Sequence, residues 1–413
     1  ILSSAFETAV SGAPGPVVIE VPEEIWKTEG EGDQPFAFDP LAPVVAVPAQ
    51  TEKIVRALVS ARKPLILAGG GIRTVQDAAL LKTWAELTGI PVVTTGNGRG
   101  ALSEKHPLCF GRVGFGGGTC PADEAFCQCD VLVTVGCGVS DMVTYEYTQS
   151  TSADIFVISY GNPSPKIFPE EHLCCDAGSA LKLLISQSSR SFGPYTEWKN
   201  ILESKCREWN EQLDGAASRE STGLNPSFFF RELGKALPQD AKVCGGAGLH
   251  VVYANDYLPA LNPRSFLAAV NFGSMGFGLP AAMAAGFIYP GRKVVAVLGD
   301  GEFLMTLQDL ETVVREKIAP VLIVVNDSSY RVLEMKQRIG SGRIIGTRHG
   351  NPDFMKTAEA FGLKGIRVAS KTDVAPAISS ILSSAGPLLV ELKVDPEDLP
   401  PTNLAAAMRM GQS

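Results

Sequence analysis

Two acidic residues follow consecutive apolar segments in the last third of the chain. Asp300 lies in the tripeptide Gly-Asp-Gly after the apolar run 294–298, and Asp327 follows the apolar run 320–325. They stand 27 positions apart with a helical pattern over 304–316 between them, as in one β-α-β crossover. Ligands of open α/β sheets bind outside the carboxyl ends of the strands, so we expect both carboxylates to converge on one hard cation.

The glycines beside Asp300 are suited to a phosphorylated ligand. Gly299 and Gly301 let such a ligand approach the backbone, and the N–H groups that open the following helix face an anion. With the two carboxylates, this pattern predicts Mg²⁺ holding a diphosphate. The alternative interpretation of the pattern is a turn at Gly-Asp-Gly and a helix cap at Asn326 and Asp327.

The elements that must position these residues alternate between apolar runs and helical patterns. This alternation predicts the α/β fold class, with two doubly wound parallel-sheet, Rossmann-like domains preceded by a fragment of a third. The expected strands are 64–68, 90–95, 130–136 and 154–159 in the first domain, and 242–244, 266–269, 293–298, 319–325, 365–368 and 387–394 in the second.

The expected domain boundaries follow from this pattern. They are a domain tail over 1–24, a linker over 25–50, a central domain over 51–190, a connector over 191–222 and a last domain over 223–413. The tail should hold a helix near 3–10 and one buried strand over 15–22. Because the chain opens inside this fragment, we expect further residues upstream of Ile1.

Composition excludes several classes of protein. The 413 residues are 45% hydrophobic and 19% charged, as in ordinary globular proteins. The net charge of −8 disfavours nucleic acid as a partner, and no apolar run reaches the roughly 20 residues that cross a membrane. Nine scattered cysteines fit reduced thiols, so we expect a cytoplasmic protein.

Several motifs resemble one enzyme family. The Gly-Asp-Gly motif, followed at the distance typical of the family by Asn326 and Asp327, resembles the signature of thiamine diphosphate-dependent enzymes. In that signature the second motif is usually Asn-Asn. Segments that resemble the acetolactate synthase-like branch occur in consistent order at 12–22, 89–95, 272–282 and 351–356. On this resemblance, the chain comprises the tail of a pyrimidine-binding domain, a central domain and the diphosphate-binding domain.

The resemblance implies a set of site residues. Asp300 and Asp327 would bind Mg²⁺ through side-chain oxygens, and Ser329 through its backbone carbonyl. The carbonyl of Gly273 would accept a hydrogen bond from the cofactor's 4′-amino group, and Met275 would bend the cofactor. The implied cofactor-binding residues are Gly248, Leu249, His250, Gly273, Met275, Gly299, Asp300, Gly301, Glu302, Asp327 and Ser329.

The resemblance leaves the catalytic residue unassigned. The family's catalytic glutamate lies in the pyrimidine-binding domain, of which only the tail is recognised here, so no residue of this chain receives that role. The family's site forms between subunits, which implies a homodimer or homotetramer. FAD is not expected to bind tightly. The segment that begins at Tyr160 is Tyr-Gly-Asn-Pro, whereas FAD-binding members of the family that this chain resembles have Asp-Ile-Asp-Pro there.

The function implied is thiamine diphosphate-dependent carboligation or decarboxylation of small 2-oxo acids. One alternative is a 2-hydroxyacyl-thioester lyase or another decarboxylase of the same cofactor family. A second alternative is a non-catalytic binding remnant. A dinucleotide-dependent dehydrogenase would need a Gly-x-Gly-x-x-Gly turn followed by an acidic strand end, and these do not occur in that order.

Overall fold

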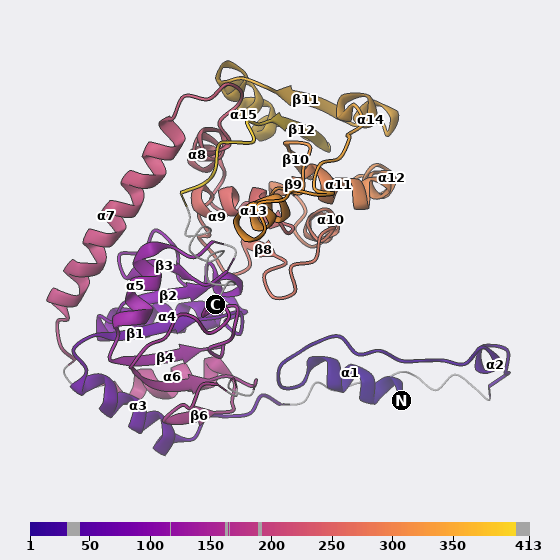
Figure 1. The fold of residues 1–413 in the computed structure, drawn as a ribbon. Coiled ribbons are helices and arrows are strands. Elements are labelled where there is room, and N and C mark those ends of the chain that lie inside the picture. Colours follow the sequence, from indigo (N-terminus) through magenta and orange to yellow (C-terminus); the bar gives the residue numbers. More distant parts are fainter. Residues whose placement is uncertain (31–41, 116, 162–163, 165, 189–191, 402–413) are drawn as a thin grey trace.

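The computed structural model describes residues 1–30, 42–115, 117–161, 164, 166–188 and 192–401. Two six-stranded sheets, in which all pairs are parallel, organise these residues (Figure 1). The first sheet has the order β3-β2-β1-β4-β5-β6 and the second the order β11-β12-β10-β9-β7-β8. The predicted fold class of two α/β domains is therefore confirmed.

The strands of the first sheet are β1 (Pro64–Ala68), β2 (Val92–Thr95), β3 (Cys109–Val113), β4 (Val131–Val135), β5 (Asp154–Ile158) and β6 (Glu171–Leu173). Those of the second are β7 (Lys242–Gly245), β8 (Phe266–Ala268), β9 (Val294–Gly299), β10 (Val321–Asn326), β11 (Lys364–Val368) and β12 (Leu388–Lys393). Both sheets fall within the predicted ranges 51–190 and 223–413, although the exact domain boundaries stay predictions.

Helices flank both sheets. Those that precede β7 in the chain are α1 (Leu2–Val10), α2 (Glu23–Trp26), α3 (Pro48–Ser60), α4 (Val75–Thr88), η1 (Gly96–Gly98), α5 (Cys120–Gln128), α6 (Ala177–Gln187), α7 (Thr196–Ser218) and α8 (Pro226–Ala236). The later ones are α9 (Leu249–Tyr257), α10 (Gly278–Ile288), α11 (Asp300–Thr306), η2 (Leu307–Asp309), α12 (Leu310–Arg315), α13 (Arg331–Gly340), α14 (Phe354–Ala360), η3 (Lys371–Asp373) and α15 (Val374–Ser383). None of these helices is long and apolar enough to span a membrane.

The core of the second domain has one buried layer on each face of its sheet. Along β9, Val295 and Val297 belong to the cluster that includes residues of α8, α9 and α15, whereas Ala296 and Leu298 belong to the cluster with α10 and α11. Alternate residues of a strand face opposite sides of a sheet, so a continuous apolar run is what two covered faces require.

Helix α9 is fixed at its carboxyl end by the first domain. The Arg99 guanidinium donates to Asn255 Oδ1 at 2.7 Å, and Arg112 donates to Asp256 Oδ1 at 2.7 Å. Glu104 balances Arg99 through a further ion pair. The long helix α7 also connects the two domains along one side of the molecule (Figure 1). The opposite, amino end of α9 carries Leu249 and His250, which line the cavity of the second domain.

The structure differs from the expected elements in three places. No strand forms over 15–22, whose side chains are exposed, because no described strand lies beside it to complete its hydrogen bonds. The helix expected over 304–316 begins earlier, at Asp300, and is interrupted by η2. Strands β3 and β6 were not predicted: β3 contains Arg112, and β6 has only three residues. Much of the expected linker, residues 31–41, lies outside the described residues.

Candidate cofactor site

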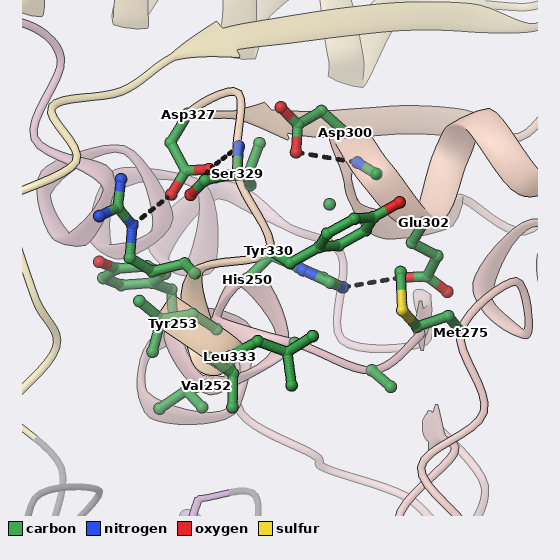
Figure 2. Close-up of a pocket in the computed structure, with 18 of the residues that line it drawn as sticks. His250, Val252, Tyr253, Met275, Asp300, Glu302, Asp327, Ser329, Tyr330 and Leu333 are labelled. Carbon is green, nitrogen blue, oxygen red and sulfur yellow. Dashed lines mark hydrogen bonds and ion pairs between the residues drawn. The ribbon is translucent and has the colours of Figure 1, made fainter. Parts of the chain in front are cut away.

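A cavity of about 680 Å³ opens at the carboxyl ends of β9 and β10 (Figure 2). All eleven residues predicted to bind the cofactor line this cavity. Phe115 and Glu146 of the first domain line it as well, although sequence reasoning gave them no role. Apolar side chains of Val252 and Leu333 form another part of its wall. The residues share one site because β9 and β10 are adjacent parallel strands.

Asp300 is buried at the first turn of α11, directly after β9. Its Oδ1 accepts the Gly301 N–H at 2.9 Å, and its Oδ2 accepts the Ser328 N–H and the Asn351 amide, both at 2.7 Å. Burial raises the pKa of Asp300, and the negative charge of Asp327 adds to the rise, whereas the hydrogen bond from Asn351 opposes it. The carboxylate is thus oriented in a setting where its charge is unfavourable.

Asp327 follows β10, and both of its carboxylate oxygens accept hydrogen bonds. Its Oδ1 accepts the N–H and the hydroxyl of Ser329, each at 3.0 Å, and its Oδ2 accepts Nε of Arg331 at 2.9 Å. Figure 2 shows Asp300, Asp327 and Ser329 near one another at one end of the cavity. Sequence reasoning missed Arg331, because its contact with Asp327 depends on how the loop after β10 leads into the first turn of α13.

These residues fit a hard divalent cation. The pKa of Asp300 is raised mainly by burial, and the neighbouring charge of Asp327 adds to the rise; a cation between the two carboxylates would offset this unfavourable negative charge. Oxygen donors are also the ligands that Mg²⁺ prefers. Among the described residues no cluster of three or more His, Cys, Asp or Glu side chains could hold a metal. A cation here would therefore need ligands besides carboxylates, such as a backbone carbonyl and a diphosphate.

His250 and Glu302 form a buried pair in the wall of the cavity. His250 Nε2 lies 2.8 Å from Glu302 Oε2, and their side chains are 6% and 1% exposed. A Cβ added at Gly248 or at Gly299 would lie 2.7 Å from the imidazole ring. Glycine is thus needed at both positions to leave room for the His250 ring.

Glu302 also holds the loop that carries Met275. Its Oε1 accepts the N–H groups of Gly276 at 3.1 Å and Gly278 at 3.2 Å. Gly273 and Gly276 adopt positive φ angles of 69° and 85°, which favour glycine. Figure 2 shows Met275 beside Glu302. The acidic residue predicted to lie along a diphosphate therefore also sets the path of the Met275 loop.

Asn351 is a second residue whose role sequence reasoning missed. Its amide nitrogen donates to Asp300 Oδ2 at 2.7 Å and to Asn326 Oδ1 at 2.9 Å. Asn326 in turn donates to Glu391 Oε1 of β12 at 2.6 Å. The segment 351–356 was recognised as a resemblance, but nothing in its spacing indicated that it contacts the strand ends.

The fold and the site together define a doubly wound α/β protein with a cofactor cavity at its strand ends. Residues 51–184 match the family described as "Thiamine pyrophosphate enzyme, central domain", and residues 246–392 match "Thiamine pyrophosphate enzyme, C-terminal TPP binding domain". The chain belongs to the thiamine pyrophosphate enzyme family. The match to a cofactor-binding domain indicates thiamine diphosphate as the cofactor.

Several curated relatives are acetolactate synthases. The chain is 30% identical to the probable acetolactate synthase large subunit of Methanocaldococcus jannaschii, over 96% of this chain and 70% of that protein. It is 29% identical to the acetolactate synthase isozyme 2 large subunit of Escherichia coli K12, over 96% and 71%. For the chloroplastic acetolactate synthase 1 of Oryza sativa the identity is 29%, over 95% and 63%.

Proposed function

We propose that the protein uses thiamine diphosphate and Mg²⁺ to carry out carboligation or decarboxylation of a 2-oxo acid. The observation that carries the proposal is the meeting of Asp300 and Asp327 in one cavity of the domain that matches the family's cofactor-binding domain. The names of the relatives support acetolactate synthase-like chemistry.

In this proposal the chain's own residues divide the binding work. Asp300 and Asp327 would hold Mg²⁺ with the backbone carbonyl of Ser329, and the N–H groups near Gly248 and Gly301 would face the diphosphate. When bound, thiamine diphosphate supplies a nucleophilic carbon that attacks the carbonyl of the substrate. Leu249, His250, Gly273, Met275, Gly299 and Glu302 would line the remainder of the cofactor's path.

The Met275 loop and the apolar wall would orient the reacting groups. Glu302 fixes the loop through two backbone N–H groups, so Met275 is held against the cavity, where it would bend the cofactor. Val252 and Leu333 present hydrocarbon to the cavity and would keep water from the reacting carbon. The acid or base that activates the cofactor stays unassigned in this chain.

A second candidate function is cleavage of a 2-hydroxyacyl thioester, or another decarboxylation by the same cofactor. The observation behind it is Lys336, which lines the cavity. The acetolactate synthase-like branch that this chain resembles has Trp at this position, a residue tied to the choice of the second 2-oxo acid. An ammonium group there would attract an anionic part of any substrate, the carboxylate of a 2-oxo acid included, so this position leaves the choice of substrate to the assay below.

The direct test has two parts. Calorimetry on the purified 413-residue chain with thiamine diphosphate and Mg²⁺ should detect cofactor binding that disappears when Mg²⁺ is removed by a chelator. A product assay, run on a protein that includes the pyrimidine-binding domain, would then compare pyruvate with a 2-hydroxyacyl thioester. Cofactor binding that is independent of Mg²⁺ would contradict the metal assignment, and turnover of the thioester alone would favour the second candidate.

We also propose a homodimer or homotetramer. Large apolar side chains are exposed around the cavity's domain, with Phe272 94%, Ile288 67% and Phe287 53% exposed. Large apolar side chains that are exposed in a monomer are often covered at protein interfaces. Light scattering after size-exclusion chromatography would measure the oligomeric state, and a monomer at micromolar concentration would contradict this proposal.

A further inference from the structure

The carboxylate that we propose as the second metal ligand is already paired with a cation of its own chain. Arg331 Nε donates to Asp327 Oδ2 at 2.9 Å, and the two side chains are only 7% and 13% exposed. The other oxygen, Oδ1, accepts two hydrogen bonds from Ser329. The carboxylate is therefore fixed in orientation, with the guanidinium on one side and its own loop on the other.

Arg331 is in turn held by a buried acid. Its Nη1 donates to Glu334 Oε1 at 3.2 Å, and the Glu334 side chain is fully buried. Glu334 is shared with Arg338, which donates to the same oxygen at 3.0 Å, and with Arg348 at 3.5 Å. Because Arg338 and Arg348 also offset the single negative charge of Glu334, the positive charge of Arg331 stays available to offset Asp327.

The charge at position 327 explains why such a partner would be needed. The family signature that this site resembles has a neutral amide where Asp327 stands. A second carboxylate beside Asp300 attracts a metal ion but repels a diphosphate. A guanidinium in contact with that carboxylate cancels most of its field at the distance of a phosphate group.

We propose that Arg331 is a positioning residue that allows an aspartate, Asp327, to act as the second metal ligand. It fixes the Asp327 carboxylate and offsets its charge, so that the site carries about the same total charge as one with an amide. This inference rests on the proposed function, because it concerns how the site would accept Mg²⁺ and a diphosphate.

The inference predicts opposite changes in two affinities. In Arg331→Gln, Mg²⁺ alone should bind about threefold tighter, because the nearby positive charge is gone. Thiamine diphosphate at saturating Mg²⁺ should bind about tenfold more weakly, equivalent to about 1.4 kcal/mol, because Asp327 now repels the diphosphate. A purely structural role for Arg331 would weaken both affinities together. Calorimetry on the ligand-free 413-residue chain measures both.

Two further variants keep the test informative if Arg331→Gln is poorly folded. Arg331→Lys retains the charge and should leave both affinities within about threefold of the parent. Asp327→Asn combined with Arg331→Gln restores a neutral pair and should bind thiamine diphosphate within about threefold of the parent. The matched control is Arg315→Gln, which breaks an exposed pair with Glu311 at the same spacing of four residues and should change neither affinity.

The outcomes separate this inference from the proposed function. If Arg331→Gln weakens Mg²⁺ and thiamine diphosphate binding alike, and the double variant does not recover, the inference is overturned while the cofactor assignment stands. If the parent binds Mg²⁺ but no thiamine diphosphate, the proposed function fails, and the sign of the Mg²⁺ change still decides the role of Arg331. A parent that binds neither would overturn both.

Discussion

Removal of the Asn351 amide should loosen the sheet edge where β9 and β10 end. Its Nδ2 donates to Asp300 Oδ2 at 2.7 Å and to Asn326 Oδ1 at 2.9 Å, which belong to different strand ends. A hydrogen bond to a charged group contributes about 1.5–3 kcal/mol, and one between neutral groups about 0.5–1.5 kcal/mol. Their sum predicts that Asn351→Ala lowers the free energy of unfolding by about 2–4 kcal/mol.

The assay is denaturant unfolding at neutral pH in metal-free buffer. The matched control is Asn262→Ala, also in the last domain, because the Asn262 amide donates a single exposed hydrogen bond to the Gln239 carbonyl at 3.1 Å. The control should lose less than about 1 kcal/mol. If Asn351→Ala loses no more than the control, the amide does not tie the strand ends together and the reasoning is refuted.

Three other predictions follow from the same structure. Because the pKa of Asp300 is raised in the folded protein, its contribution to the free energy of unfolding is present at acid pH and is lost as pH rises through that pKa. Denaturant unfolding should therefore show that the metal-free parent is more stable than Asp300→Ala by a margin that shrinks from pH 4 to pH 7. A thiol reagent at pH 8 should modify exposed Cys174 well before Cys244, since burial raises the pKa of Cys244 to about 12; equal rates would contradict this. The purified protein should carry no flavin absorbance, because the strand end that would need a carboxylate has Tyr160, whose hydroxyl accepts the Val44 N–H instead; stoichiometric flavin would show the opposite.

Much of the fold was predictable because its strands are covered on both faces. Runs such as 64–68 and 294–298 are continuously apolar, and that pattern has few interpretations once helical patterns separate the runs. Strand β3 was not predicted because its residues are only partly apolar. Strand β6 was not predicted because three residues are too few to show an alternating pattern. The segment 15–22 has a strand's composition but no described neighbour to pair with.

Only those site residues that lie in short sequence motifs could be predicted from the sequence. Gly-Asp-Gly and the Asn-Asp pair end adjacent strands, and parallel topology brings such ends together. Asn351 contacts Asp300 across 51 positions of chain, and Arg331 depends on the orientation of the first turn of α13. Neither contact follows from a periodicity or a motif, since each arises from how loops close over the strand ends.

Calorimetric titration of the 413-residue chain with thiamine diphosphate, with and without Mg²⁺, tests the central claim most directly. Asp300 accepts three hydrogen bonds that orient it in the cavity. We predict saturable binding that requires Mg²⁺ in the parent and is abolished in Asp300→Ala. Equal binding by the parent and Asp300→Ala, or binding by the parent that persists without Mg²⁺, would contradict the assignment of this cavity as the Mg²⁺-dependent cofactor site.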